Sequence, residues 1–400
     1  MATSVPEGHV GNLTAEQSEK LRQFWRAIFQ VAGLLQESES FGKDAVTHDD
    51  DKFGLTKQFQ EILKTNSPES IRESVWGMIK CDHPDTLALR FLRARKWDVN
   101  KALVMLISAL NWRDKEMHVD SDIMKNGEAG AAAEVPASDN AKNVGKDFMT
   151  QLRMGKSFIH GVDKEGRPIC IVRVRLHRGG EQCAESIERY TVHIIETTRL
   201  VLSPEVETAT IIFDMTSFSL ANMDYAPVKF MIKCFEANYP ESLGSVLIHN
   251  SPWIFQGIWR IIRGWLDPVV AAKVHFTSGR AGLEKFIEPS RLLKELGGDE
   301  DWEYKYVEPV EGENATMDDK AGAEAVLKAR SSLVVDMQAA TLEWIHAADA
   351  ATIDAAASKR QEIAGKFREN YWELDGHIRA KSILDRQGVI GEKGKITFYP

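Results

Sequence analysis

The sequence lacks the features that would place it in several large classes of protein. Only four of its 400 residues are cysteines, and no two of them form a C-x-x-C pair. Scattered thiols give neither a metal site nor a redox motif, and they suit a reducing cytosol. No stretch approaches the roughly 18 uninterrupted apolar residues of a membrane-spanning helix, and the N-terminus has no basic and apolar signal segment. We therefore expect a cytoplasmic protein that associates with endomembranes only peripherally.

A surplus of positive charge is also missing. Lysine and arginine total 50 against 59 aspartate and glutamate residues, which gives a formal net charge of −9. Binding to nucleic-acid backbones requires a basic surface. The composition therefore excludes nucleic acid as the main partner.

The motifs of common enzyme classes are absent as well. There is no G-x-S-x-G nucleophile elbow and no G-x-G-x-x-G after a predicted strand, and the histidines show no metal-binding spacing. His249 stands near Ser251, but a histidine in a strand is more often a hydrogen-bonded structural residue. The sequence thus predicts a protein that is not an enzyme and that has neither a metal nor a cofactor.

The N-terminal third is predicted to be helical. Thr14 and Gln17 form a capping box for a helix over 14–35, whose apolar residues recur at three- and four-residue spacing. Asp98 is placed to cap a second helix with its leucines on one stripe. The segment 121–146 is rich in glycine, alanine and asparagine and has no periodicity. We expect it to be a mobile insertion.

Beyond residue 147, short apolar runs alternate with helical patterns. Strands are predicted at 166–176, 210–214, 245–249 and 272–277, and helices at 186–202, 223–238 and 253–266. Buried strands separated by helices are typical of a largely parallel sheet in an α/β fold. After an acidic bend the pattern is again helical to about residue 367, and a last unit spans 371–387.

The predicted helix at 253–266 is the most informative segment. One apolar stripe holds Ile254, Ile258, Ile261 and Trp265, and a second holds Phe255, Trp259, Ile262 and Leu266. A helix that is apolar on two sides is usually fully buried. Alternatively, one face covers an apolar pocket and the other meets a membrane, which the tryptophans and the two arginines Arg260 and Arg263 favour. The periodicity alone leaves both readings open.

Five segments together carry a family resemblance. They are FLRARKWDVNKA at 91–102, GVDKEGRPI at 161–169, TIIFDM at 210–215, NYPESLGSVLIHNSPWIF at 238–255 and RGWLDPVVAAKVHF at 263–276. In this order and spacing they resemble the CRAL-TRIO lipid-binding family, and within it the fungal phosphatidylinositol transfer proteins. The resemblance extends from about residue 56 to residue 308.

The resemblance implies a helical N-terminal lobe and an αβα lobe, whose mostly parallel sheet floors an apolar lipid cavity closed by a mobile gate helix. The helix 253–266 falls at the gate position, which favours the reading with a pocket and a membrane. Gate or membrane contacts are then expected from Trp253, Ile254, Phe255, Ile258, Trp259, Ile262, Trp265 and Leu266. The expected parts are an N-terminal helix and linker (1–55), a helical lobe (56–120), the insertion (121–146), the lipid-binding domain (147–308) and a C-terminal helical extension (309–400).

The same resemblance implies four residues that bind an inositol-phosphate headgroup. The FLRARK motif places Arg95 and Lys96, the YPE motif places Glu241, and the LDPxxxxK motif places Lys273. Taken alone, the basic run would be read as a solvated helix edge. A buried phosphodiester needs cationic partners, and a carboxylate can bind inositol hydroxyls. Val270 stands where the family has a threonine, so one headgroup hydrogen bond is expected to be absent.

A second departure concerns phosphatidylcholine. Members that bind both lipids hold its phosphate with two hydroxyl residues in the strand before the position of Asp214, and these are Ala209 and Ile211 here. Neither side chain can donate a hydrogen bond. We therefore expect poor binding of phosphatidylcholine and a different apolar lipid as the second ligand. Thr208 and Thr210 lie one residue away, so a shift of one residue would restore the site.

The resemblance thus implies a monomer that binds phosphatidylinositol, exchanges it at a membrane surface, and presents it to a lipid kinase. An alternative is a lipid-regulated sensor or scaffold, whose helical extensions bind a protein partner. A lipid hydrolase that uses His249 and a haem-binding member of the family are further readings that the residues leave open.

Overall fold

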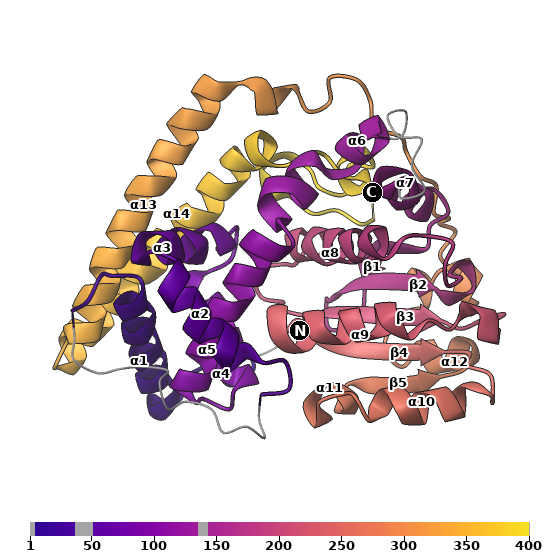
Figure 1. Cartoon of the computed structure of the whole chain (residues 1–400), viewed down its shortest axis with the longest axis horizontal. Helices are drawn as coiled ribbons and strands as arrows, with labels where there is room; N and C mark the ends of the chain where they lie inside the picture. The colour runs from indigo at the N-terminus through magenta and orange to yellow at the C-terminus, as the bar shows by residue number, and fades with distance from the viewer. Residues whose placement is uncertain (1–4, 37–50, 135–142, 400) are drawn as a thin grey trace. The chain divides into compact units, whose positions relative to one another are not determined.

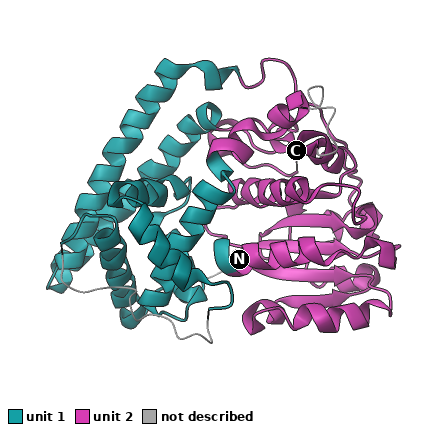
Figure 2. Cartoon of the chain, in the orientation of Figure 1, with its two compact units in different colours: residues 1–120, 237–241, 315–378 teal, residues 121–236, 242–314, 379–400 magenta. Residues whose placement is uncertain are grey.

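The computed structural model describes residues 5–36, 51–134 and 143–399. They form two compact units, each described by itself (Figure 2). Unit 1 consists of Met1–Asp120, Ala237–Glu241 and Ala315–Ile378, and unit 2 of Ser121–Glu236, Ser242–Asn314 and Arg379–Pro400. The expected C-terminal extension is therefore divided between the two units. Most of the predicted N-terminal linker (37–50) and part of the predicted insertion (135–142) lie outside the described residues.

Unit 1 is built from helices. Its N-terminal helices are α1 (Ala15–Val31), α2 (Leu55–Thr65), α3 (Pro68–Met78), α4 (Pro84–Ala94) and α5 (Val99–Asn111), and a π-helical turn (Trp112–Glu116) continues α5. The predicted capping box is confirmed, because Gln17 N donates to Thr14 Oγ1 and Thr14 N donates to Gln17 Oε1. Asp98 caps α5 as predicted. Both helices begin where a side chain satisfies one of the first free backbone N–H groups.

Two long helices complete unit 1. The sequence predicts one helical segment to about residue 367, but the chain forms an antiparallel pair, α13 (Lys320–His346) and α14 (Ala350–Ile378) (Figure 1). Ala347 leaves the helical conformation, and Asp349 Oδ1 accepts a hydrogen bond of 2.9 Å from Thr352 N. Periodicity did not reveal this reversal, because each helix keeps an apolar side toward the core.

A ring stack and a buried ion pair join these helices to the rest of unit 1. The Trp76 ring stacks on the rings of Trp25 and Phe367, with centroids 6.0 and 5.8 Å apart. Arg360 of α14 donates to both carboxylate oxygens of Asp85 in α4, at 2.8 Å for Oδ2, and its guanidinium lies over the Trp25 ring. Burial acts to raise the pKa of Asp85, but the charge of Arg360 holds it below its ordinary value. The two long helices therefore belong to the core of this unit.

The described part of unit 2 contains a five-stranded sheet in the order β1-β2-β3-β4-β5 (Figure 1). The strands are β1 (Ser157–Val162), β2 (Pro168–Arg173), β3 (Ala209–Asp214), β4 (Leu243–His249) and β5 (Val274–Thr277). β1 is antiparallel to β2, and β2 to β5 are parallel. These pairings confirm the predicted α/β class. β1 was not predicted from the sequence. Its register shifts between Ile159 and Val162, where Gly161 has a φ of +70°.

Helices connect the parallel strands of unit 2. They are α8 (Ala184–Leu200), α9 (Tyr225–Lys233), α10 (Phe255–Arg263) and α11 (Pro268–Ala272), while α6 (Lys125–Glu134) and α7 (Val144–Arg153) precede β1, and α12 (Gly279–Leu283) and α15 (Ile383–Arg386) follow β5. Right-handed crossovers between parallel strands in consecutive order place every crossover helix on the same face of the sheet. Side chains of α8, α9 and α10 accordingly join one apolar cluster with the strands. The described part of the predicted insertion is helical, with a kink at Gly127.

Removal of the Arg360 charge is expected to destabilise the protein strongly. Arg360→Met leaves the Asp85 carboxylate buried without its cation, which costs about 3–5 kcal/mol in comparable pairs. Lys359→Met on the same helix is the control, because Lys359 pairs with Glu343 at 3.2 Å where both side chains are about half exposed, and such a pair contributes about 0–1 kcal/mol. Urea unfolding measures both changes. Equal losses of unfolding free energy would contradict the role given to Arg360.

Candidate functional site

The parallel strands present two different faces, because successive side chains of a strand point to opposite sides. The face under α8, α9 and α10, here called the apolar face, carries Cys170, Val172, Ile211, Phe213, Val246, Ile248 and Val274. The opposite face carries Ile169, Ile171, Ile212 and Leu247, which pack against residues between 283 and 296. The register of each strand therefore decides which residues lie under the crossover helices.

Thr210 belongs to the opposite face. Its hydroxyl donates to Asp163 Oδ2 at 2.6 Å, and the side chain is fully buried. Asp163 is fixed in turn, because its Oδ1 accepts hydrogen bonds of 2.9 Å from the backbone N–H groups of Glu165 and Arg167. The turn in the GVDKEGRPI motif thus holds β3 in a register that places Ile211, and not Thr210, on the apolar face. Thr210 therefore does not supply a hydroxyl group to the apolar face in this register.

α10 covers the apolar face with one side only. Phe255, Ile258 and Ile262 are buried in the cluster with the sheet, whereas Ile261 is 49% exposed and Trp253, two residues before the helix begins, is 86% exposed. The remaining predicted gate residues, Ile254, Trp259, Trp265 and Leu266, are half-buried. The reading of this segment as a fully buried helix is therefore wrong. The second reading, with a pocket on one side and a membrane on the other, stays a prediction.

The apolar cluster under α10 is less completely buried than the cluster on the opposite face. Among the described residues, the cluster under α10 has ten buried members and thirteen that are only partly buried, while the opposite cluster has ten and three. The partly buried members come from the strands, from the helices that cover them and from the segments that connect these elements. Incompletely covered apolar surface of this kind marks ligand or membrane sites in soluble proteins.

The outward side of this region combines apolar and cationic side chains. The outer apolar residues are Trp253, Ile261, Val269 and Phe276, which are exposed by 86, 49, 49 and 42%. Arg260 and Arg263 are exposed on α10, and neither forms an ion pair with any residue for which the structure gives a position. Val269 and Phe276 were not among the residues predicted from the sequence. The apolar pair after the LDP motif could have indicated Val269, and the alternation of β5 could have indicated Phe276.

Two of the predicted headgroup residues, Arg95 and Lys96, end α4 in unit 1. Arg95 is the half-buried C-cap of the helix, and Lys96 is exposed. Lys96 and the following Trp97 both adopt the left-handed conformation, with φ of 51° and 66°. This conformation is unfavourable for residues other than glycine, and strain of this kind tends to gather at functional sites.

The other two predicted headgroup residues lie in different units. Glu241 ends the segment Ala237–Glu241, which belongs to unit 1, where the Tyr239 ring meets the edge of the Trp112 ring with centroids 5.8 Å apart. Glu241 also has a left-handed φ, of 54°. Lys273 stands between α11 and β5 in unit 2 and is half-buried. Unit 1 thus holds three of the four predicted headgroup residues.

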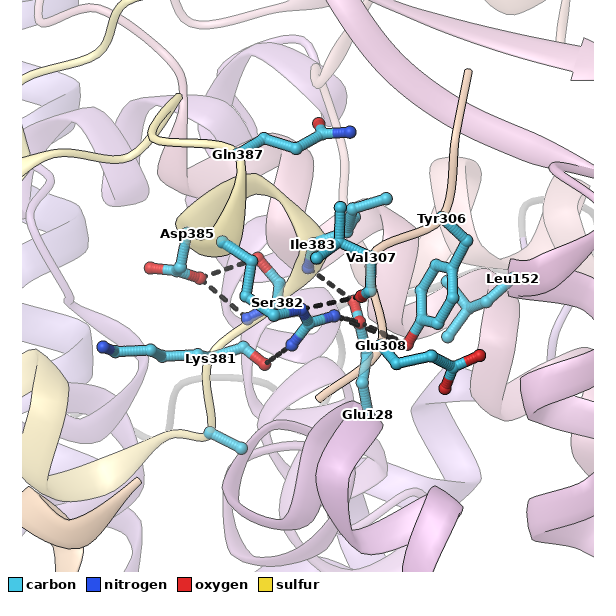
Figure 3. Close-up of polar contacts among 12 residues, drawn as sticks. Glu128, Leu152, Tyr306, Val307, Glu308, Lys381, Ser382, Ile383, Asp385 and Gln387 are labelled. Atoms are coloured by element: carbon cyan, nitrogen blue, oxygen red, sulfur yellow. Dashed lines mark hydrogen bonds and ion pairs between the residues drawn. The ribbon is translucent and has the colours of Figure 1, made fainter. Parts of the chain in front are cut away.

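A buried carboxylate anchors the C-terminal residues of unit 2 (Figure 3). Glu128 of α6 accepts hydrogen bonds of 2.9 Å from Ile383 N and from the Tyr306 hydroxyl, and it pairs with Arg386. Burial acts to raise the pKa of Glu128, but the hydrogen bond with His193 and the charge of Arg386 hold it below its ordinary value. These partners are all protein groups. We therefore assign the cluster a structural role.

His249 is unsuited to chemistry on a lipid at the apolar face. It is 1% exposed, and its Nδ1 forms a hydrogen bond of 3.0 Å with the Thr277 hydroxyl. Burial lowers the pKa of His249. It shares the side of β4 with Leu247, on the opposite face of the sheet.

In the part of the chain that the structure describes, no group of three or more His, Cys, Asp or Glu side chains is placed to hold a metal ion. No helix within it combines the length and the apolar character needed to cross a bilayer.

The chain matches one protein family through both of its units. A sequence model described as the CRAL/TRIO domain matches residues 152–298, and one described as the CRAL/TRIO N-terminal domain matches residues 55–108. A CRAL-TRIO domain-containing protein of Schizosaccharomyces pombe is 38% identical over 439 residues, which cover 98% of this chain and 95% of that protein. This chain belongs to the CRAL-TRIO family.

Two further proteins are similar to this chain. A protein of Eremothecium gossypii named phosphatidylinositol transfer protein CSR1 is 36% identical over 445 residues, which cover 98% of this chain and all of that protein. The crystal structure of a protein named Sfh5 superposes with a TM-score of 0.45 at 18% identity, over 71% of this chain and 87% of that one.

Two isoleucines on α10 are expected to differ in their contribution to stability. Ile258→Ala removes a buried side chain, 8% exposed, and is expected to cost about 2–4 kcal/mol. Ile261→Ala makes the same chemical change where the side chain is 49% exposed, and the cost is expected within about 0.5 kcal/mol of zero. Denaturant unfolding of the two variants measures the difference. Similar costs would show that α10 does not pack as described.

Proposed function

We propose that this protein binds one phosphatidylinositol molecule, with its acyl chains on the apolar face, and exchanges it between membranes. The observation that carries the proposal is the incompletely buried apolar cluster under α10. An acyl chain placed there gains about 0.8 kcal/mol for each methylene removed from water. The relative named as a phosphatidylinositol transfer protein, which matches over the full length of both chains, supports the same ligand.

The headgroup is proposed to contact Arg95, Lys96, Glu241 and Lys273. All four match the family motifs in residue type. The three cations suit the phosphodiester, and the carboxylate suits the inositol hydroxyls. Lys96 and Glu241 both have a left-handed backbone conformation. Strain of this kind clusters at functional sites, which supports a role of both residues in headgroup binding.

Phosphatidylcholine is proposed to be a poor ligand. The hydroxyl of Thr210 is bonded to Asp163 on the opposite face, and Ile211 lies in the apolar cluster. A zwitterionic headgroup there would lose its hydrogen bonds to water without replacement, which is unfavourable in an apolar site. The second ligand is therefore expected to be a more apolar lipid.

α10 is proposed to act as a gate that opens at the membrane. Its buried residues face the proposed lipid site, while the outer apolar residues and the two arginines Arg260 and Arg263 are exposed. Apolar side chains partition into the headgroup region, and arginines are attracted by anionic lipids. The protein would act as a monomer at cytoplasmic membrane surfaces, with presentation to a lipid kinase as a further step.

The alternative role of the C-terminal extension as a docking arm has less support. Met337 and Trp344 of α13 and Phe367 of α14 lie in the main core of unit 1. A deletion from about residue 320 would therefore remove core residues, and its effect on exchange would not separate the two roles. Point variants that leave the core intact are the better test.

Lys273→Ala is expected to lower the phosphatidylinositol load of the purified protein about tenfold or more, because it removes a charged hydrogen-bond donor from the proposed phosphate site. Native mass spectrometry with lipid extraction measures the load. Lys285→Ala, at an exposed position of the same unit, is the control and should change nothing. An equal phosphatidylcholine load in the unaltered protein would contradict the proposed selectivity. Retention of phosphatidylinositol by Lys273→Ala would contradict the headgroup assignment.

Membrane binding is expected to depend separately on the two kinds of outward residue. Replacing Arg260 and Arg263 by Gln should weaken binding to vesicles that contain phosphatidylserine by about 1 kcal/mol for each arginine, with little effect on pure phosphatidylcholine vesicles. Trp253→Ala should weaken binding to both kinds. Vesicle co-sedimentation measures the affinities. Unchanged binding in all variants would rule out this side of α10 as the membrane surface.

A further inference from the structure

The residues before α1 form a defined turn. Gly8 N donates to Asn12 O, and Asn12 N donates to His9 O, both at 2.9 Å. The Asn12 side chain donates to Val5 O at 2.7 Å. The turn is fixed to the first residues of α1 because Gln17 Nε2 donates to Glu7 Oε1 at 2.9 Å. We call residues 5–13 the N-terminal turn.

The N-terminal turn packs on the basic motif that follows α4. Arg93 Nη1 donates to Gly8 O at 2.8 Å. A Cβ atom on Gly8 would lie 3.2 Å from the Trp97 ring and 3.4 Å from Arg93 Cδ. Gly8 also has a φ of +81°, which favours glycine. A side chain at position 8 would therefore press against the Trp97 ring, which would have to move to accommodate it.

Trp97 has an unfavourable backbone conformation. Together with Lys96 it forms two consecutive left-handed residues, a rare conformation for large side chains. The local hydrogen bonds Trp97 N to Leu92 O (2.7 Å) and Asp98 N to Arg95 O (3.0 Å) close this bend. The bend determines the direction in which Arg95 and Lys96 leave the backbone. A contact that holds Trp97 also holds these two cations.

We propose that the N-terminal turn acts as a clasp on the headgroup motif, with Gly8 and Trp97 as positioning residues for Arg95 and Lys96. This inference rests on the proposed function, since it assigns the two cations to a phosphate-containing headgroup. It gives the segment before α1 a role in ligand selection within the same unit. A fixed pair of cations discriminates a phosphoinositol headgroup better than a mobile pair, because less conformational freedom is lost on binding.

Two glycines of the turn provide a matched test in the full-length chain. Gly8→Leu places a side chain against Trp97, whereas Gly11→Leu places the same side chain at a φ of +90° with nothing within 4 Å. Both variants carry the same kind of backbone strain within the turn, and only the first places a side chain against Trp97. Gly8→Ala is a milder version of the first change. Hydrogen exchange of the backbone amides at 96–98 and the ratio of phosphatidylinositol to total bound lipid are the two readouts.

We expect Gly8→Leu to accelerate amide exchange at 96–98 about tenfold relative to Gly11→Leu and to lower the phosphatidylinositol fraction about fivefold, which corresponds to about 1 kcal/mol. Gly8→Ala should shift both in the same direction by less. Equal behaviour of Gly8→Leu and Gly11→Leu, or faster exchange with an unchanged lipid ratio, would overturn the clasp. Absence of phosphatidylinositol from the unaltered protein would instead overturn the proposed function, and the headgroup role of the clasp with it.

Discussion

The consecutive order of the parallel strands is the constraint on which the rest of unit 2 depends. Because each right-handed crossover returns on the same side, α8, α9 and α10 all cover one face of the sheet. A slip of β3 by one residue would exchange its two faces and bring Thr210 under α10. The hydrogen bond from Thr210 to Asp163 opposes that slip. The hydrogen bond on the opposite face thus keeps the hydroxyl of Thr210 away from the apolar face.

The terminal extensions of the chain are held by one buried carboxylate in each unit. In unit 1, Asp85 pairs with Arg360 of α14, and in unit 2 Glu128 pairs with Arg386 near the C-terminus. Both carboxylates have a pKa below the ordinary value. Their contribution to stability is therefore present above the pKa of the unfolded chain and is lost as the pH falls through the lower folded-state pKa. The extensions therefore stabilise the units in which they lie.

α10 has a different environment on each side, and this difference links the fold to the proposed exchange. Phe255, Ile258 and Ile262 contribute to the apolar cluster, while Trp253 and Ile261 remain exposed. Withdrawal of the helix into a bilayer interface would replace one apolar environment by another for its buried side. In the proposed exchange, the free-energy cost of moving α10 would then be lower at a membrane than in water. Membrane contact and lipid release would be coupled through this helix.

The sequence was enough to predict the class of fold, the capped helices α1 and α5, the buried parallel strands and the family motifs, because these depend on local periodicity and on residue type. It did not reveal β1, the reversal between α13 and α14, or the exposed Val269 and Phe276. The folded structure was needed to show that Thr210 faces away from the helices and that Ile261 is exposed while Ile258 is buried. These outcomes depend on strand register and on contacts between residues that are distant in the sequence. An alternating or helical pattern does not show which of two apolar faces another element will cover.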